Sequence, residues 1–297
     1  MANASPDLER RIADIAADRV SGAADLLDRA IAVLADALST GAAIRPVAAA
    51  ICRAQPSMAS MWTAALEAIA SEQTPGRFER FAQRVARSPA ALQRVGVDHL
   101  ASGIGDPSSP IRLVTVSNSR SVTGVVQALH ERLPVQVSCS ESRPALEGRR
   151  LAAALATHGV HVTCFSDAAI AHALAAADAV IVGADAVAPS WFLNKSGTRM
   201  LAAAASLHGV PVYVVASRDK FVADAVAARL VVADGPPQDI WDAPPPGVTV
   251  RNPCFEATPL DLVTAVITDM GVLGADMVAD VCRAIHDAAT LEALKDL

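Results

Sequence analysis

The chain has 297 residues, of which 52% are hydrophobic and only 3% aromatic, and its formal net charge is −6. This length allows one large or two ordinary domains, and the charge provides no basic surface for nucleic acid or an anionic membrane. No apolar run is long enough to cross a bilayer, and residues 1–20 contain no signal-peptide core. We therefore expect a cytoplasmic protein with neither a nucleic acid nor a membrane as partner.

The five cysteines are widely spaced and form no C-x-x-C pair, which argues against a zinc site or a disulfide framework. Cys139 and Cys164 fall within predicted strands, where we expect small buried side chains. The nucleotide-binding, metalloprotease, serine-hydrolase and calcium-loop motifs are all missing from the sequence. We therefore expect no metal and no cofactor.

The first third of the chain has helical periodicity and no strand signal, which predicts a helical N-terminal domain over residues 1–108. Its expected helical segments are marked by a stripe of Leu8, Ile12, Ile15 and Ala16, and by residues 24–38, 47–53, 57–69, 78–85 and 89–100. Residues 103–110, rich in glycine, proline and serine, are the predicted linker to a second domain over residues 109–297.

Strand and helix patterns alternate after the linker, which predicts an α/β domain with a doubly wound parallel sheet. The expected strands are residues 111–116, 135–138, 160–165, 179–182, 212–215 and 230–232. The expected helices are residues 122–132, 149–158, 168–176, 197–207, 222–227, 260–270 and 274–297. A proline-rich loop over residues 234–247 interrupts this order.

The stretch over residues 179–198 contains the most informative polar side chains. Asp185 directly follows a buried strand, at the position where open α/β sheets bind their ligands. Asn194 and Lys195 precede a helix, whose free N–H groups and positive dipole end suit a phosphate. An aspartate after a strand is also a common turn former or helix cap, and each feature alone is equally compatible with a structural role.

Similar polar loops follow the other predicted strands, and in a parallel sheet they meet at one edge. These loops contain Ser117, Ser119 and Arg120 after the first strand, Glu141 and Arg143 after the second, and Lys220 after the fifth. Cations, hydroxyls and carboxylates gathered in one cleft predict a site for a small phosphorylated molecule.

The same loops resemble motifs of a superfamily that includes the alpha, beta and delta subunits of initiation factor 2B, ribose-1,5-bisphosphate isomerase and methylthioribose-1-phosphate isomerase. The matching motifs are SNSRS at 117–121, ESRPALEGRRLA at 141–152, GADAV at 183–187, NKSGT at 194–198 and NPCFEATPLDLVTAVITDMGVL at 252–273. The resemblance implies a helical domain, a Rossmann-like domain and a homodimer formed through the latter. It also implies conversion of an aldose 1-phosphate into a ketose 1-phosphate.

In this resemblance the acid aspartate of the isomerases falls on Asp185, whereas their cysteine falls on Ser117. The phosphate and hydroxyl ligands would be Ser119, Arg120, Glu141, Arg143, Asn194, Lys195 and Lys220. A serine forms no thiolate near neutral pH, and serine followed by arginine in this loop resembles the regulatory subunits. Two functions therefore stay open: a sugar-phosphate isomerase, and a non-catalytic initiation factor 2B alpha-type subunit that senses a sugar phosphate or nucleotide.

Overall fold

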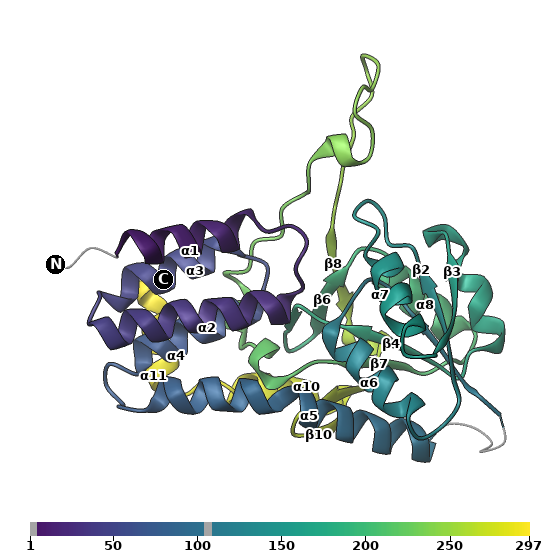
Figure 1. The fold of residues 1–297 in the computed structure, drawn as a ribbon, viewed down its shortest axis with the longest axis horizontal. Coiled ribbons are helices and arrows are strands. Elements are labelled where there is room, and N and C mark those ends of the chain that lie inside the picture. The colour runs from purple at the N-terminus through teal and green to yellow at the C-terminus, as the bar shows by residue number, and fades with distance from the viewer. Residues whose placement is uncertain (1–4, 104–108) are drawn as a thin grey trace.

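The computed structural model describes residues 5–103 and 109–297, and in it a helical part lies beside an α/β part (Figure 1). The helical part contains α1 (Pro6–Ala17), α2 (Ala23–Thr40), α3 (Ile44–Ala54) and α4 (Ala59–Ala70). Every residue of α4 except Glu67 is buried, so this alanine-rich helix is the centre of the helical core. The helices expected before residue 70 are confirmed with small shifts at their ends, whereas residues 104–108 of the expected linker lie outside the described residues.

A single long helix, α5 (Arg77–Gly103), replaces the two segments expected at residues 78–85 and 89–100. Pro89 lies inside this helix and removes one backbone hydrogen bond. The first half of α5 buries Phe78 and Phe81 in the helical core, while the second half buries Leu92 and Leu100 in the core of the α/β part. Burial on both sides of Pro89 holds the helix together, and one helix thus contributes to both cores.

The α/β part is built on a seven-stranded sheet with the order β10-β9-β7-β4-β1-β2-β3. Its strands are β1 (Ile111–Thr115), β2 (Val135–Ser140), β3 (His161–Phe165), β4 (Ala179–Gly183), β7 (Val212–Val215), β9 (Ala265–Thr268) and β10 (Gly271–Gly274). All pairings are parallel except that of β10 with β9. Cys139 is buried as expected, but Cys164 is exposed because β3 is an edge strand.

Helices cover both faces of this sheet, which confirms the predicted doubly wound architecture. The second half of α5, α6 (Arg120–His130) and α7 (Glu147–Ala156) bury one face. The other face is covered by a 3₁₀ helix (Asp167–Ala176), α8 (Thr198–Leu207) and α10 (Ala275–Ala284). Alternate residues along β4 are buried in the two different cores, as its continuous apolar run requires.

A small antiparallel sheet of β5 (Ala186–Val187), β6 (Trp191–Lys195) and β8 (Phe255–Pro259) connects the two parts. On β6, Leu193 is buried in the helical core, whereas its neighbour Phe192 is buried against the large sheet. Strand alternation therefore lets one strand bury side chains in two cores.

The expected strand at residues 230–232 is wrong. The short helix α9 (Asp224–Ala227) is followed by a segment over residues 230–254, whose ends lie against the body of the molecule and whose middle rises away from it (Figure 1). Val231 and Val232 are exposed and pair with no strand, so their β-branched side chains have no sheet surface to pack on.

The expected helix at residues 260–270 is also wrong. Thr258 and Pro259 end strand β8, and only a 3₁₀ turn at Leu260–Leu262 precedes β9 and β10. The sequence of β9 is short and rich in β-branched residues, and the strand is buried beside β7. The expected continuous helix at residues 274–297 is instead α10, α11 (Ala288–Ala293) and a final 3₁₀ turn, because Asp287 accepts a hydrogen bond from the Thr290 N–H and caps α11.

His286 lies buried in the joint between α10 and α11 and makes stability depend on pH. Burial lowers the pKa of His286 to about 4 from an ordinary 6.5. Between these values the unfolded chain binds a proton that the folded protein does not bind, so stability falls as the pH drops through this window. From about pH 7 to about pH 5 we expect this group to remove about 2 kcal/mol of unfolding free energy, measured by urea unfolding.

The variant His286→Gln should lack this component, whereas His208→Gln, which changes an exposed histidine, should retain it. Equal pH dependence in wild type and His286→Gln would contradict the assignment to His286.

Candidate functional site

The large sheet contains a topological switch point between β1 and β4. From β1 the chain proceeds outward to β2 and β3, whereas from β4 it proceeds to β7 and β9 on the opposite side. The loop with Ser117 and Arg120 leaves β1, and the loop with Asp185 leaves β4, so the two loops flank this point. Ligands of open α/β sheets bind in the crevice that such a divergence creates.

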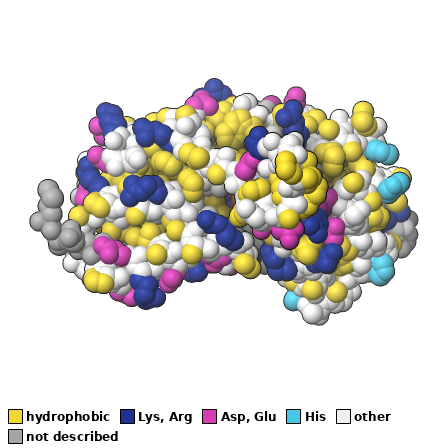
Figure 2. Space-filling view, turned by 90° about the horizontal axis from the view of Figure 1, so that it is seen from above, with side chains coloured by type: hydrophobic (Ala, Val, Ile, Leu, Met, Phe, Trp, Pro, Cys, Tyr) yellow, Lys and Arg dark blue, Asp and Glu magenta, His cyan; other side chains and the backbone are white. Residues whose placement is uncertain are grey.

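A cavity of about 1780 Å³ opens at this switch point. One side is lined by α6, the loop after β4 and strand β6 of the α/β part. The other side is lined by residues 18–26 and 53–58 of the helical part. Seen from above, charged side chains of both signs gather where the two parts meet, at the base of the projecting segment (Figure 2). The cavity therefore has walls from distant stretches of sequence.

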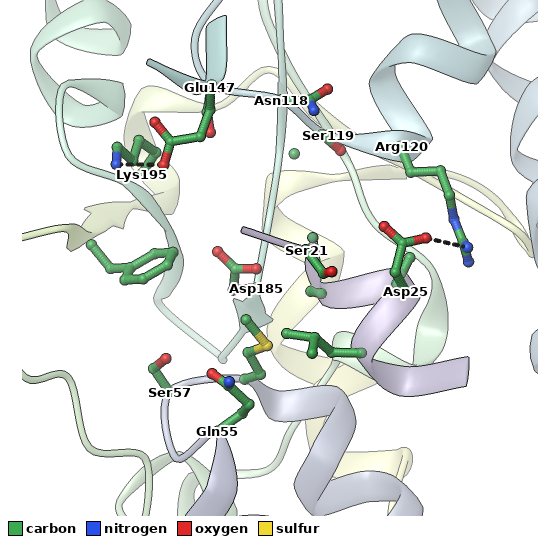
Figure 3. A pocket seen from close by; sticks show the side chains of 18 of the residues that line it. Ser21, Asp25, Gln55, Ser57, Asn118, Ser119, Arg120, Glu147, Asp185 and Lys195 are labelled. Carbon is green, nitrogen blue, oxygen red and sulfur yellow. Dashed lines mark hydrogen bonds and ion pairs between the residues drawn. The ribbon is translucent and has the colours of Figure 1, made fainter. Parts of the chain in front are cut away.

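Asp185 directs its carboxylate into this cavity (Figure 3). Its backbone N–H donates to the Leu193 carbonyl at 2.8 Å, and its carbonyl accepts from the Ala59 N–H at 3.0 Å. Within the described chain, the carboxylate itself has no hydrogen-bond partner. Burial raises the pKa of Asp185, and the nearby ammonium groups of Lys220 and Lys195 act in the opposite direction. The result is a carboxyl group held rigidly by its backbone, with a proton affinity above the ordinary value.

Two buried lysines lie near Asp185 and line the cavity. Lys195, at the end of β6, is 4% exposed and pairs with Glu147, with 2.8 Å between Nζ and Oε1. Lys220, in a 3₁₀ turn after β7, is 6% exposed and has no ion pair within residues 5–103 and 109–297. Lys220 is thus the buried cation of this cavity that remains available to an anion.

Arg120 lines the cavity but is already paired. Its Nη1 lies 2.9 Å from Asp25 Oδ1 and 2.8 Å from Asp28 Oδ2, both on α2. This cluster joins the start of α6 to the helical part across the cavity (Figure 3). A ligand phosphate could contact Arg120 only in competition with two carboxylates.

The loop after β1 combines an unusual backbone with a helix cap. Ser117 has a φ of +69°, a conformation that few residues other than glycine adopt, and its N–H donates to Ser142 Oγ at 2.8 Å. Ser119 caps α6 by accepting from the Val122 N–H at 3.4 Å. Both serines line the cavity at a helix N-terminus, where anions are stabilised.

Of the site residues expected from the sequence, the structure brings Asp185, Ser117, Ser119, Arg120, Asn194, Lys195 and Lys220 to one cavity. It does not bring Glu141 and Arg143 to the cavity wall. Glu141 pairs with Arg149, and the Arg143 side chain is exposed while its backbone N–H donates to Asp167.

Sequence reasoning missed Glu147 and the whole contribution of the helical part. Glu147 lies in the motif at residues 141–152 and begins α7, so its place at a helix start after β2 was a usable signal. Ser21, Asp25, Gln55 and Ser57 line the cavity from the helical part (Figure 3), and no local pattern distinguishes Ser21 and Asp25 from ordinary loop and helix residues.

Within the described ranges, no group of three or more histidine, cysteine, aspartate or glutamate side chains is arranged to hold a metal ion. In the same ranges, no helix is both long and apolar enough to cross a membrane. Besides Asp185, hydroxyl groups and lysine ammonium groups, the lining of the cavity includes the carboxylate of Glu147 and the thiol of Cys254.

Comparison with known proteins identifies the family. The model of the initiation factor 2 subunit family matches residues 5–275, nearly the whole chain. The chain belongs to this family. Two solved structures of Pyrococcus horikoshii OT3 proteins share its fold at 23% identity. For translation initiation factor eIF-2B the TM-score is 0.75, over 90% of this chain and 97% of that chain. For 5-methylthioribose 1-phosphate isomerase the TM-score is 0.68, over 94% of this chain and 87% of that chain.

More similar sequences within the family carry isomerase names. Ribose 1,5-bisphosphate isomerase of Archaeoglobus fulgidus is 34% identical over 172 residues, which are 56% of this chain and 54% of that protein. Methylthioribose-1-phosphate isomerase of Exiguobacterium sibiricum is 31% identical over 222 residues, which are 68% of this chain and 63% of that protein. The chain spans about half the length of the first two curated relatives it matches.

The geometry of the switch point makes Gly183 sensitive to substitution. An added Cβ at this position would lie 2.6 Å from Ser119 Oγ and 2.8 Å from Ser119 Cβ. We expect Gly183→Ala to displace the loop after β1 and lower the free energy of unfolding by about 1–3 kcal/mol, measured by urea unfolding. Gly103→Ala is the control, since an added Cβ there meets no atom of the described residues within 4 Å. An unchanged stability of Gly183→Ala would show that the loop moves without cost.

Proposed function

We propose that this protein binds a small sugar phosphate in the cavity at the switch point and isomerises an aldose 1-phosphate to a ketose 1-phosphate. The observation that supports this proposal most directly is that the carboxyl group of Asp185 faces the cavity, lies near two buried lysines and has a raised pKa. The isomerase names of its relatives support the substrate class.

The reaction requires an acid and a base in one place, because the phosphate on C1 prevents simple ring opening. Asp185 in its protonated form gives its proton to the ring oxygen, and the bond between that oxygen and C1 breaks. The hydrogen on C2 then passes to C1 with its electron pair, the C2 hydroxyl becomes a carbonyl, and the hydroxyl proton returns to the carboxylate of Asp185. A raised pKa keeps this group protonated over more of the pH range in which it must act as an acid.

The phosphate group is best held where α6 begins. The first N–H groups of this helix, the hydroxyl of Ser119 and the ammonium group of Lys220, which has no ion pair among the described residues, provide donors and positive charge at one wall of the cavity. Asn194 and Lys195 line the wall next to Asp185 and would contact the sugar. Sequestration of the sugar between the two parts would exclude water from the hydrogen transfer.

The second candidate function is a non-catalytic subunit that binds the same ligand as a signal. Ser117 favours it, because a hydroxyl group occupies the position that matches the thiol of the resembling isomerases, and serine is a much weaker acid than cysteine. In this case, ligand binding in the cavity would stabilise one arrangement of the assembly to which this subunit belongs.

We also propose that two copies associate through the α/β part, as the family resemblance implies. Met200 and Leu207 on α8 and Met277 on α10 are exposed apolar side chains that support an interface on this part. The mass of the protein in solution, measured by light scattering, tests this proposal.

The isomerase proposal predicts that Asp185→Asn abolishes turnover and preserves binding. We expect phosphorus NMR to show a new ketose phosphate signal for wild type with one of four substrates: ribose 1,5-bisphosphate, ribose 1-phosphate, 5-deoxyribose 1-phosphate or methylthioribose 1-phosphate. Loss of the acid should lower the rate at least about 100-fold. Ligand-induced thermal stabilisation should remain in the variant, because asparagine keeps the shape of the side chain.

Line broadening without conversion in wild type would instead support the sensor function. If none of the four sugars changes the spectrum, both forms of the sugar-phosphate proposal are wrong.

Lys220 provides a separate test of phosphate binding. Its replacement in Lys220→Met removes a buried ammonium group, and a hydrogen bond to a charged partner contributes about 1.5–3 kcal/mol. We expect affinity for the sugar phosphate to fall about 10-fold to 100-fold, measured by calorimetry. Lys295→Met, which changes an exposed lysine near the C-terminus, is the control. Equal affinities for both variants and wild type would remove Lys220 from the site.

A further inference from the structure

We propose that Glu147 is a specificity-determining residue that restricts the cavity to sugars with a single phosphate, an inference that rests on the proposed function. Glu147 is the first residue of α7 and lines the cavity beside Lys195 (Figure 3). Its Oε1 accepts from Lys195 Nζ at 2.8 Å, and the two side chains are only 19% and 5% exposed. This buried ion pair holds the carboxylate of Glu147 and the ammonium group of Lys195 in place on that wall of the cavity.

The pairing leaves few cations for phosphate. Arg120 is held by Asp25 and Asp28, and Lys195 is held by Glu147. Among the lysines and arginines that line the cavity in the described ranges, Lys220 is the buried one without an ion pair. The remaining cations of the lining, Arg19, Arg53 and Arg150, are exposed to solvent, where attraction to an anion is weakened by water. The described lining therefore offers a buried, unpaired cation to one phosphate group, but it offers none to a second phosphate group.

A phosphate placed against Lys195 would also meet the carboxylate of Glu147. Both groups carry negative charge, and burial strengthens their repulsion. If position 147 carried a neutral amide, the ammonium group of Lys195 would be free to bind the second phosphate. The charge of Glu147, and not the shape of its side chain, therefore sets the preference.

The second carboxylate oxygen of Glu147 indicates which ligand group this wall of the cavity binds in place of a phosphate. Glu147 Oε2 is covered and has no hydrogen-bond partner in the described part of the chain. A buried acceptor without a donor is costly, and a sugar hydroxyl is a neutral donor of suitable size. We therefore place the hydroxyl-bearing end of the sugar against Glu147 and Lys195, and its single phosphate near Lys220 and the start of α6.

The first experiment compares two ligands by calorimetry. Wild type should bind ribose 1-phosphate at least tenfold more tightly than ribose 1,5-bisphosphate. In Glu147→Gln the ratio of bisphosphate affinity to monophosphate affinity should rise at least tenfold. The matched control is Glu72→Gln, which makes the same charge change in an ion pair with Arg45 outside the cavity and should leave the ratio unchanged. A wild type that prefers the bisphosphate overturns the inference without reference to any variant.

The second experiment separates this inference from the proposed function. Inorganic phosphate, titrated in phosphorus NMR experiments, should bind Glu147→Gln at least fivefold more tightly than wild type. The double variant Glu147→Gln with Lys195→Met should lose this gain, because the released cation is absent. If neither sugar binds wild type, the proposed function is wrong, and the phosphate titration alone then tests the role of Glu147. Tighter phosphate binding by Glu147→Gln that is lost in the double variant supports this role. Equal phosphate binding by all three proteins overturns it.

Discussion

The divergence of the chain at strands β1 and β4 is the constraint on which the site depends. These strands are parallel neighbours, but the connections that follow them lead to opposite sides of the sheet. The loops at their ends must separate, and Gly183 permits Ser119 to approach the end of β4 at the point of separation. The crevice, the start of α6 and the carboxylate of Asp185 all result from this local arrangement.

Burial of charge gives the cavity its chemistry. Desolvation raises the pKa of Asp185, and Lys195 and Lys220 limit that rise. Lys195 in turn is balanced by Glu147, and each of these side chains would be costly without its partners. The cavity thus combines one carboxyl group of raised pKa with one buried lysine, Lys220, that has no ion pair in the described ranges, which is an arrangement suited to a phosphorylated sugar.

The helical part completes this site and does more than cover it. Asp25 and Asp28 pair with Arg120, and the N–H of Ala59 holds the backbone of Asp185. Helix α5 and strand β6 each contribute side chains to the helical core and to one of the two cores that flank the large sheet. Because the two parts share these elements, packing in the cores sets the relative position of the two walls of the cavity.

The sequence by itself determined the parallel sheet, most of its strands and the set of polar loops at one edge. These features follow from local periodicity and from the rule that carboxyl ends of parallel strands meet, so Asp185, Asn194 and Lys220 could be predicted as neighbours. Local pattern failed at residues 260–270, where a threonine and proline resembled a helix start but burial beside β7 favoured strand β9. Only the tertiary structure decided which cations are free. The pairing of Arg120 with α2 and of Lys195 with Glu147 depends on side chains tens of residues apart, and no sequence spacing encodes a distance between charges that the fold alone brings together.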